Sequence, residues 1–214
     1  MPAKGYFRGI ALAGVFGLAC VTGPAAASLL FSDDFDSDAS STILNFNNLI
    51  NWTVSNGTVD YIRQGGFSLG CVGGAGGCID MDGSTNDAGR LVSRASFSVV
   101  AGTTYRMTIS VSGNQRGGAS DSISWGLTDG TIDAPAAGNG GILPSDPYLP
   151  RTLTFSGVSG TYRLFVESSG NDNIGPLLDN VVFESLTPDG TVPEPATLLL
   201  VGGALLGLVA GRRR

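Results

Sequence analysis

Apolar and polar residues alternate over short stretches in the middle of the chain, which is the pattern of half-buried strands. Between Tyr105 and Val111 every second residue is apolar, and the residues between them are Arg, Thr and Ser. The same period of two runs through residues 123–127 and 162–166. Clusters of Gly, Asn, Asp and Pro separate these stretches and supply turns. The pattern therefore predicts an all-β domain whose strands each have one buried and one wet face.

Seven further stretches have the composition of strands. They are residues 29–35, 52–55, 58–63, 79–81, 91–99, 149–155 and 177–183. Residues 42–51 are the one segment of this region with a pattern that also suits a short helix. About ten strands within about 155 residues fit two packed sheets. We therefore expect a jelly-roll-like β-sandwich over residues 28–186.

The chain begins with a segment typical of secretory signal peptides. Lys4 and Arg8 are followed by an uncharged apolar stretch, and the segment ends on small residues up to Ala27. An apolar run of about 15 residues is shorter than the ~20 that a membrane-spanning helix needs. We predict that residues 1–27 are a signal peptide and that signal peptidase cuts between Ala27 and Ser28.

The other end of the chain has three consecutive parts. They are the motif Val192-Pro193-Glu194-Pro195, an apolar run over residues 197–210, and the terminal Arg212, Arg213 and Arg214. As a helix the run extends about 21 Å, short of the ~30 Å hydrocarbon core of a bilayer. Arginines stay on the cytoplasmic side of a membrane, which predicts that residues 28–191 lie beyond the inner membrane. Residues 187–191 are the expected linker.

Motif, apolar run and basic end together resemble the PEP-CTERM sorting signal of Gram-negative bacteria, here over residues 192–214. The resemblance implies recognition by an exosortase, a membrane transpeptidase, and processing near the Pro-Glu-Pro motif. It also implies an inner-membrane intermediate held by a short C-terminal hydrophobic helix. Release or attachment at the cell envelope, surface or extracellular matrix would follow. The alternative is a plain C-terminal anchor.

Composition removes several kinds of function. The chain has no histidine, which excludes Ser-His-Asp and Cys-His catalysis and His-ligated zinc. Its formal net charge is −6, and residues 28–191 hold seven arginines against 17 acidic residues, a net charge of −10. Nucleic acid is therefore not an expected partner, because phosphate binding needs clustered Lys and Arg.

The cysteines agree with export. Removal of the signal peptide removes Cys20 and leaves Cys71 and Cys78, which a Gly-rich stretch separates. That stretch is supple enough to close a small ring, and two thiols outside the cytoplasm tend to oxidise. We therefore predict a Cys71–Cys78 disulfide. A redox or metal role is the weaker alternative, because two thiolates without His or further Cys make a poor zinc site.

Four local motifs resemble the galactose-binding-like jelly rolls found in exported bacterial proteins and carbohydrate-binding modules. They lie at residues 31–36, 80–84, 112–117 and 175–181. The resemblance implies a sandwich fold and carbohydrate binding. It also implies a structural Ca²⁺ that ties the first strand to the last, with ligands from Asp33, Asp34 or Asp36 and from Asp179. The alternative is a solvated acidic run at the start of the domain.

A second acidic motif lies at the end of one predicted strand. Asp80 and Asp82 alternate with Ile79 and Met81, so we expect both carboxylates on the outer face. Two neighbouring carboxylates could hold calcium. A turn whose Asp and Asn side chains satisfy their own backbone is the favoured reading.

Sugar binding needs aromatic platforms joined to a few polar groups. The candidate ligand-binding residues are Asn114, Gln115 and Arg116, at an expected strand end, together with Tyr61 and Tyr148, whose rings are the freest to be exposed. A plain hairpin turn is the alternative for residues 114–116.

Glycoside hydrolysis needs two carboxyl groups across a cleft. Glu167 and Glu184 are the only glutamates of residues 28–186, and the alternation of residues 162–166 places Glu167 toward solvent. We therefore expect an exported, non-catalytic surface or matrix protein with exopolysaccharide as its candidate ligand. The alternatives are a structural or adhesive matrix protein without a specific ligand and, less favoured, a glycoside-active enzyme.

Overall fold

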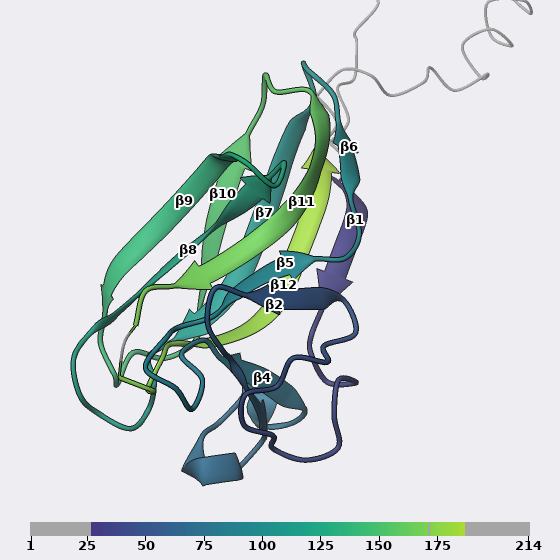
Figure 1. Cartoon of the computed structure of the whole chain (residues 1–214). Helices are drawn as coiled ribbons and strands as arrows, with labels where there is room; N and C mark the ends of the chain where they lie inside the picture. The colour runs from purple at the N-terminus through teal and green to yellow at the C-terminus, as the bar shows by residue number, and fades with distance from the viewer. Residues whose placement is uncertain (1–26, 171, 187–214) are drawn as a thin grey trace, which may run out of the picture. The chain divides into compact units, whose positions relative to one another are not determined.

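The computed structural model describes residues 27–170 and 172–186, which form two antiparallel sheets packed face to face (Figure 1). Sheet 1 has the order β10-β7-β12-β4-β3, with β1 paired to β12. Its strands are β1 (Ala27–Asp33), β3 (Asp60–Arg63), β4 (Gly77–Asp80), β7 (Thr104–Ser112), β10 (Leu149–Phe155) and β12 (Leu177–Leu186). The all-β sandwich expected from the sequence is confirmed.

Sheet 2 has the order β2-β5-β11-β8-β9, with β6 paired to β11. Its strands are β2 (Trp52–Ser55), β5 (Arg90–Ser93), β6 (Phe97–Val99), β8 (Asp121–Thr128), β9 (Asp133–Ile142) and β11 (Gly160–Ser168). Two short 3-10 turns, η1 (Gly66–Ser68) and η2 (Val72–Gly74), lie in the connection from β3 to β4. Figure 1 shows sheet 2 crossing in front of sheet 1.

The alternation of apolar residues fills the space between the sheets. In β7 the residues Tyr105, Met107, Ile109 and Val111 are all buried, as the period of two requires. Tyr105, Phe155 and Phe183 form a cluster in which each ring centroid lies 5.6–6.3 Å from the other two. Large aromatic rings bury much apolar area, so this cluster stabilises the sandwich.

Three segments differ from the sequence expectation. Residues 42–51 form no helix; the N–H of Ile43 donates to the carbonyl of Tyr61 instead. The expected strand 91–99 is divided into β5 and β6, because the chain leaves the sheet at Arg94, whose N–H donates to Asn51. The strand β9 has no counterpart in the prediction, since its sequence of Ala, Gly, Asn and Pro lacks apolar alternation. It pairs only with β8, and Pro is tolerated at such an edge.

A disulfide between Cys71 and Cys78 joins the two ends of the Gly-rich stretch, as predicted. The sulfurs lie in a small buried cluster with Ile62, Leu69 and Leu177. Gly76 has a φ of +70°, and a Cβ there would overlap the carboxylate of Asp36. Only glycine fits such a close approach at a left-handed φ, so the path of the chain between the two cysteines requires glycine at position 76.

The strands β1 and β12 bring the two ends of the described domain together. Ala27 pairs with Leu186 and Ser28 pairs with Ser185. Ala27, the last residue of the predicted signal peptide, lies in β1, whereas residues 1–26 of that segment, the linker 187–191 and the C-terminal hydrophobic helix lie outside the described residues. Within residues 27–170 and 172–186, no helix is long and apolar enough to cross a membrane.

Candidate functional site

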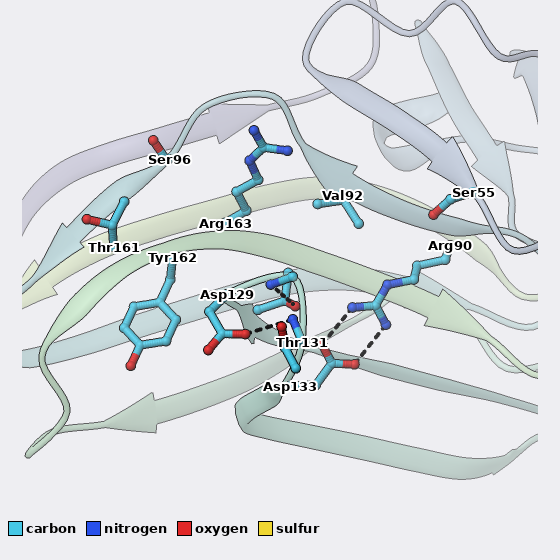
Figure 2. Close-up of a pocket in the computed structure, with 12 residues that line it drawn as sticks. Ser55, Arg90, Val92, Ser96, Asp129, Thr131, Asp133, Thr161, Tyr162 and Arg163 are labelled. Carbon is cyan, nitrogen blue, oxygen red and sulfur yellow. Dashed lines mark hydrogen bonds and ion pairs between the residues drawn. The ribbon is translucent and has the colours of Figure 1, made fainter.

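The outer face of sheet 2 carries a groove with a volume of about 790 Å³, here called the polar groove (Figure 2). Its walls include Ser55, Arg90, Asp129, Asp133, Tyr162 and Arg163. Strand alternation places Arg163 there, because Leu164 and Val166 of β11 enter the core and Arg163 points outward; Tyr162 is in phase with the core residues and borders the groove from that side of the strand. In β5, Leu91 enters the core and Arg90 points outward for the same reason.

Arg90 is locked in place in the groove. Its guanidinium donates two hydrogen bonds to Asp133, at 2.9 and 2.7 Å, and one to Glu167 at 2.7 Å. It also lies over the ring of Phe165, with its central carbon 4.3 Å from the ring centroid. Asn56 donates to the second oxygen of Glu167 at 2.8 Å. These contacts fix the floor of the groove and use the carboxylates around Arg90.

Both aspartates of the groove are held as carboxylates. Burial opposes ionisation of Asp133, but the hydrogen bonds from Arg90 and Thr128 and the positive charge of Arg90 together outweigh it and lower the pKa of Asp133 below its usual value. The backbone N–H groups of Ile132 and Thr131 donate to Asp129 and lower its pKa. Asp129 and Asp133 are therefore ionised and make one side of the groove negatively charged. Each carboxylate accepts hydrogen bonds from a donor that is fixed in place.

Arg163 differs from Arg90. Its side chain is exposed, and it makes no hydrogen bond or ion pair with any residue of the described ranges. Figure 2 shows its guanidinium extending away from Asp129 and Asp133, with Tyr162 on the opposite side of β11. Ser96 and Thr161, two further hydroxyl-bearing residues of the groove, lie beside it.

A second hollow of about 490 Å³ lies on the same sheet. Ser122, Ser124 and Asn139 line it, and Glu167 contributes to its wall. Glu167 also pairs with Arg90, which belongs to the polar groove. The outer face of sheet 2 thus offers an extended polar surface on both sides of the Arg90–Glu167 ion pair.

The residues expected to bind a ligand do not lie in the polar groove. Tyr61 is fully buried and its hydroxyl donates to the carbonyl of Ala39 at 3.0 Å, so the expectation of an exposed ring is wrong. The paired strands β3 and β4 and the segment before them cover it. Asn114 is also buried, where its side chain accepts the N–H groups of Arg116 and Gly117. Asn114 therefore stabilises a local turn after β7, but the connection it begins crosses from sheet 1 to β8 of sheet 2, so it is not a hairpin.

Two of the expected residues do meet, in a separate hollow of about 600 Å³. Gln115 and Tyr148 line it, together with Cys71 of the disulfide. Gln115 clamps Gly70, accepting its N–H at 2.8 Å and donating to its carbonyl at 3.0 Å. Burial raises the pKa of the Tyr148 hydroxyl, and no group of residues 27–170 or 172–186 forms a hydrogen bond with it.

The four aspartates expected to bind Ca²⁺ have other partners. The carboxylate of Asp33 accepts the indole N–H of Trp52 at 2.8 Å, and Asp36 accepts the N–H of Gly77 at 2.7 Å. Asp179 accepts the N–H of Val72 at 2.9 Å. Asp34 accepts the N–H of Asp36 at 3.2 Å.

Within the described ranges, the one group of three candidate metal ligands that converge is Cys71, Cys78 and Asp179, and its two sulfurs are joined. The four carboxylates do not form one ligand set there, and Ca²⁺ binding stays a prediction.

Asp80 and Asp82 are fully buried, so the expectation that both lie on the outer face is wrong. Gly170 lies against Asp82, Gly175 lies against both side chains, and the N–H of Gly175 donates to Asp80 at 2.9 Å. Arg116 forms an ion pair with Asp80. Burial outweighs this pair and raises the pKa of Asp80 to about 7.

Comparison with known proteins bears on the C-terminal end of the chain and on the fold. The family described as the PEP-CTERM protein-sorting motif matches residues 191–214. The chain carries a PEP-CTERM sorting motif. This motif indicates an exported protein that an exosortase processes at the membrane and that is sorted to the cell surface. No curated protein matches the chain in sequence.

Solved structures similar to the domain include two sugar complexes and an adhesin domain. TmCBM61 in complex with beta-1,4-galactotriose is 13% identical, with a TM-score of 0.40 over 63% of this chain and 86% of that one. The carbohydrate-binding module CBM6cm-2 from Cellvibrio mixtus lichenase 5A, in complex with cellotriose, is 12% identical, with a TM-score of 0.39 over 73% and 97%.

The K3 adhesin domain of Lys-gingipain from Porphyromonas gingivalis is 17% identical, with a TM-score of 0.44 over 74% and 99%. At TM-scores below 0.5 these similarities assign neither a ligand nor an activity to this chain.

Proposed function

We propose that this PEP-CTERM protein is a non-catalytic surface or matrix protein that binds polysaccharide in the polar groove. The observation that supports the proposal is the groove itself: a hollow of about 790 Å³ on an exposed sheet face, lined by hydroxyls and guanidinium groups. Polysaccharide chains present many hydroxyls, and a site for them needs a few placed polar groups on a rigid surface. Sheet 2 supplies that surface.

The state of the groove's carboxylates favours binding over hydrolysis. A glycosidase needs one carboxylic acid with a raised pKa to protonate the leaving oxygen. The pKa values of Asp129 and Asp133 are instead lowered by their hydrogen bonds. Asp80, whose pKa is raised, is fully buried against Gly175 and does not line the groove.

Affinity electrophoresis of the full chain through gels that contain single polysaccharides tests the proposal. The panel holds neutral glucans, xylan and galactan and the acidic polymers alginate and polygalacturonate. We expect at least one polymer to slow the protein, and Tyr162→Ala combined with Ser55→Ala to reduce the retardation. Thr152→Ala, on sheet 1, is the matched control and should migrate as the unaltered chain does. No retardation by any polymer would favour a structural matrix protein without a specific ligand.

A further inference from the structure

The hydrogen-bonding capacity of the polar groove is uneven. Both oxygens of Asp133 accept from Arg90, and Glu167 accepts from Arg90 and Asn56. Asp129 accepts two backbone N–H groups. Both oxygens of Asp133 and of Glu167 and the Oδ1 of Asp129 are therefore engaged before any ligand arrives, and Arg90 uses three of its four terminal N–H donors on Asp133 and Glu167.

Arg163 is the cation of the groove that keeps its donors. A guanidinium carries five N–H donors in a planar fork, and no residue of the described ranges accepts any of them. In Figure 2 no dashed line reaches Arg163, whereas Arg90 is tied to Asp133. Thr161 lies two residues before Arg163 on the same strand and hence on the same face.

We propose that Arg163 makes the polar groove selective for polysaccharides that carry carboxylate groups, such as uronic acid polymers. This inference rests on polysaccharide binding in the groove and names the class of polymer. A planar carboxylate accepts two parallel hydrogen bonds from a guanidinium, a geometry that neutral sugar hydroxyls do not match. The hydroxyls of Thr161 and Ser96 lie in the same groove as Arg163 and would form hydrogen bonds with hydroxyls of the neighbouring sugars.

The acidity of the domain does not oppose this selectivity at short range. Repulsion between exposed charges that lie more than about 8 Å apart is largely screened at physiological ionic strength. A carboxylate in direct contact with Arg163 forms charge-assisted hydrogen bonds, which are about twice as strong as neutral ones. The negative groups of the groove are themselves held by Arg90 and by backbone N–H groups.

The test compares each acidic polymer with its own carboxyl-reduced form, in which the uronic acids have become neutral sugars. The full chain is titrated with alginate and polygalacturonate and with both reduced polymers, at 50 and 300 mM salt. We expect at least a tenfold tighter dissociation constant for the acidic form of a bound polymer, and a smaller ratio at the higher salt.

Arg163→Ala should abolish this ratio while leaving binding of the reduced polymer unchanged. Arg163→Lys should restore only part of it, because an ammonium lacks the planar fork. Arg63→Ala, which removes the same charge from sheet 1, is the control and should keep the full ratio.

Equal binding of acidic and reduced polymers, or binding of neutral polymers alone, would overturn the carboxylate selectivity and leave polysaccharide binding standing. If no polymer of either kind binds, both proposals fail.

Discussion

Replacing Asp80 by asparagine is expected to flatten the pH dependence of the domain's stability between pH 4 and pH 7. Burial raises the pKa of Asp80 from 3.8 to about 7 in the folded protein, and the ion pair with Arg116 offsets only part of this effect. In the unfolded chain the same carboxyl ionises near its usual value. Between the two pKa values the unfolded state loses a proton that the folded state retains.

The sign and size of the effect follow from proton linkage. Stability falls with rising pH wherever the folded state binds more protons, so this carboxyl destabilises the fold progressively from pH 4 to pH 7. The difference between the unfolded pKa of 3.8 and the folded pKa of about 7 corresponds to about 4 kcal/mol, because one pKa unit is worth 1.36 kcal/mol. Below pH 4 and above pH 7 its contribution is constant, because both states are then equally protonated.

The assay is urea unfolding of the full chain at pH 4, 5, 6, 7 and 8, followed by circular dichroism. Asp80→Asn keeps an acceptor for the N–H groups of Gly175 and Asp82 but cannot ionise. It should remove about 4 kcal/mol of the loss seen in the unaltered chain. A smaller slope should remain, because burial also raises the pKa of Asp121 and of Asp179 to about 6.

Asp34→Asn, at an exposed carboxylate, is the control and should leave the slope unchanged. The reasoning would be refuted by an unaltered protein whose stability rises from pH 4 to pH 7, or by an Asp80→Asn slope equal to that of the control.

Four further predictions concern the disulfide, the core, the sorting motif and calcium. Cys71→Ser should lower the free energy of unfolding by about 2.5 kcal/mol through the lost cross-link of a short loop, measured by urea denaturation under oxidising conditions; an unchanged midpoint would contradict it. Phe183→Ala, at the aromatic cluster, should cost about 3–5 kcal/mol, whereas Phe67→Ala, at a ring that is 56% exposed, should stay within about 0.5 kcal/mol. Alanines in place of Pro193-Glu194-Pro195 should leave an unprocessed species in the membrane fraction on immunoblots, and normal processing would reject the motif's role. If Ca²⁺ binds the folded domain, a hundredfold excess over its dissociation constant should stabilise it by about 2.7 kcal/mol relative to a chelator, and identical melting curves would speak against the ion.

The fold was predictable wherever the sequence repeats with a period of two. In β7 the residues from Tyr105 to Val111 are buried in the order that the alternation demands. The strand β9 was not predictable on that basis, because an edge strand of Ala, Gly and Pro gains its place by pairing with β8 and buries little apolar surface. Edge pairing depends on a partner far along the chain, which local composition does not encode.

The candidate site was predicted less well for a related reason. Tyr61 and Asp80 sit in short strands with suitable local patterns, but their burial is decided by segments that arrive from elsewhere: Ala39 beside Tyr61, and Gly175 over Asp80. The polar groove draws Arg90, Asp133 and Arg163 from three strands. Each is an ordinary outward-facing polar position in sequence, and only the pairing of β5, β8, β9 and β11 makes them neighbours.

The placement of β12 has a mechanical consequence. β12 pairs with β7 on one side and with β4 and β1 on the other, and it ends at Leu186, the last residue described. Suppose that the chain is pulled through the segment after Leu186 while the polar groove is held in place. The backbone hydrogen bonds of β12 would then be loaded together in shear, because they lie perpendicular to the strands. Tension between Ala27 and Leu186 would instead open the β1–β12 rungs one at a time from their shared end. The same domain is therefore mechanically strong between a C-terminal tether and a bound polymer, and weak when pulled apart by its two ends.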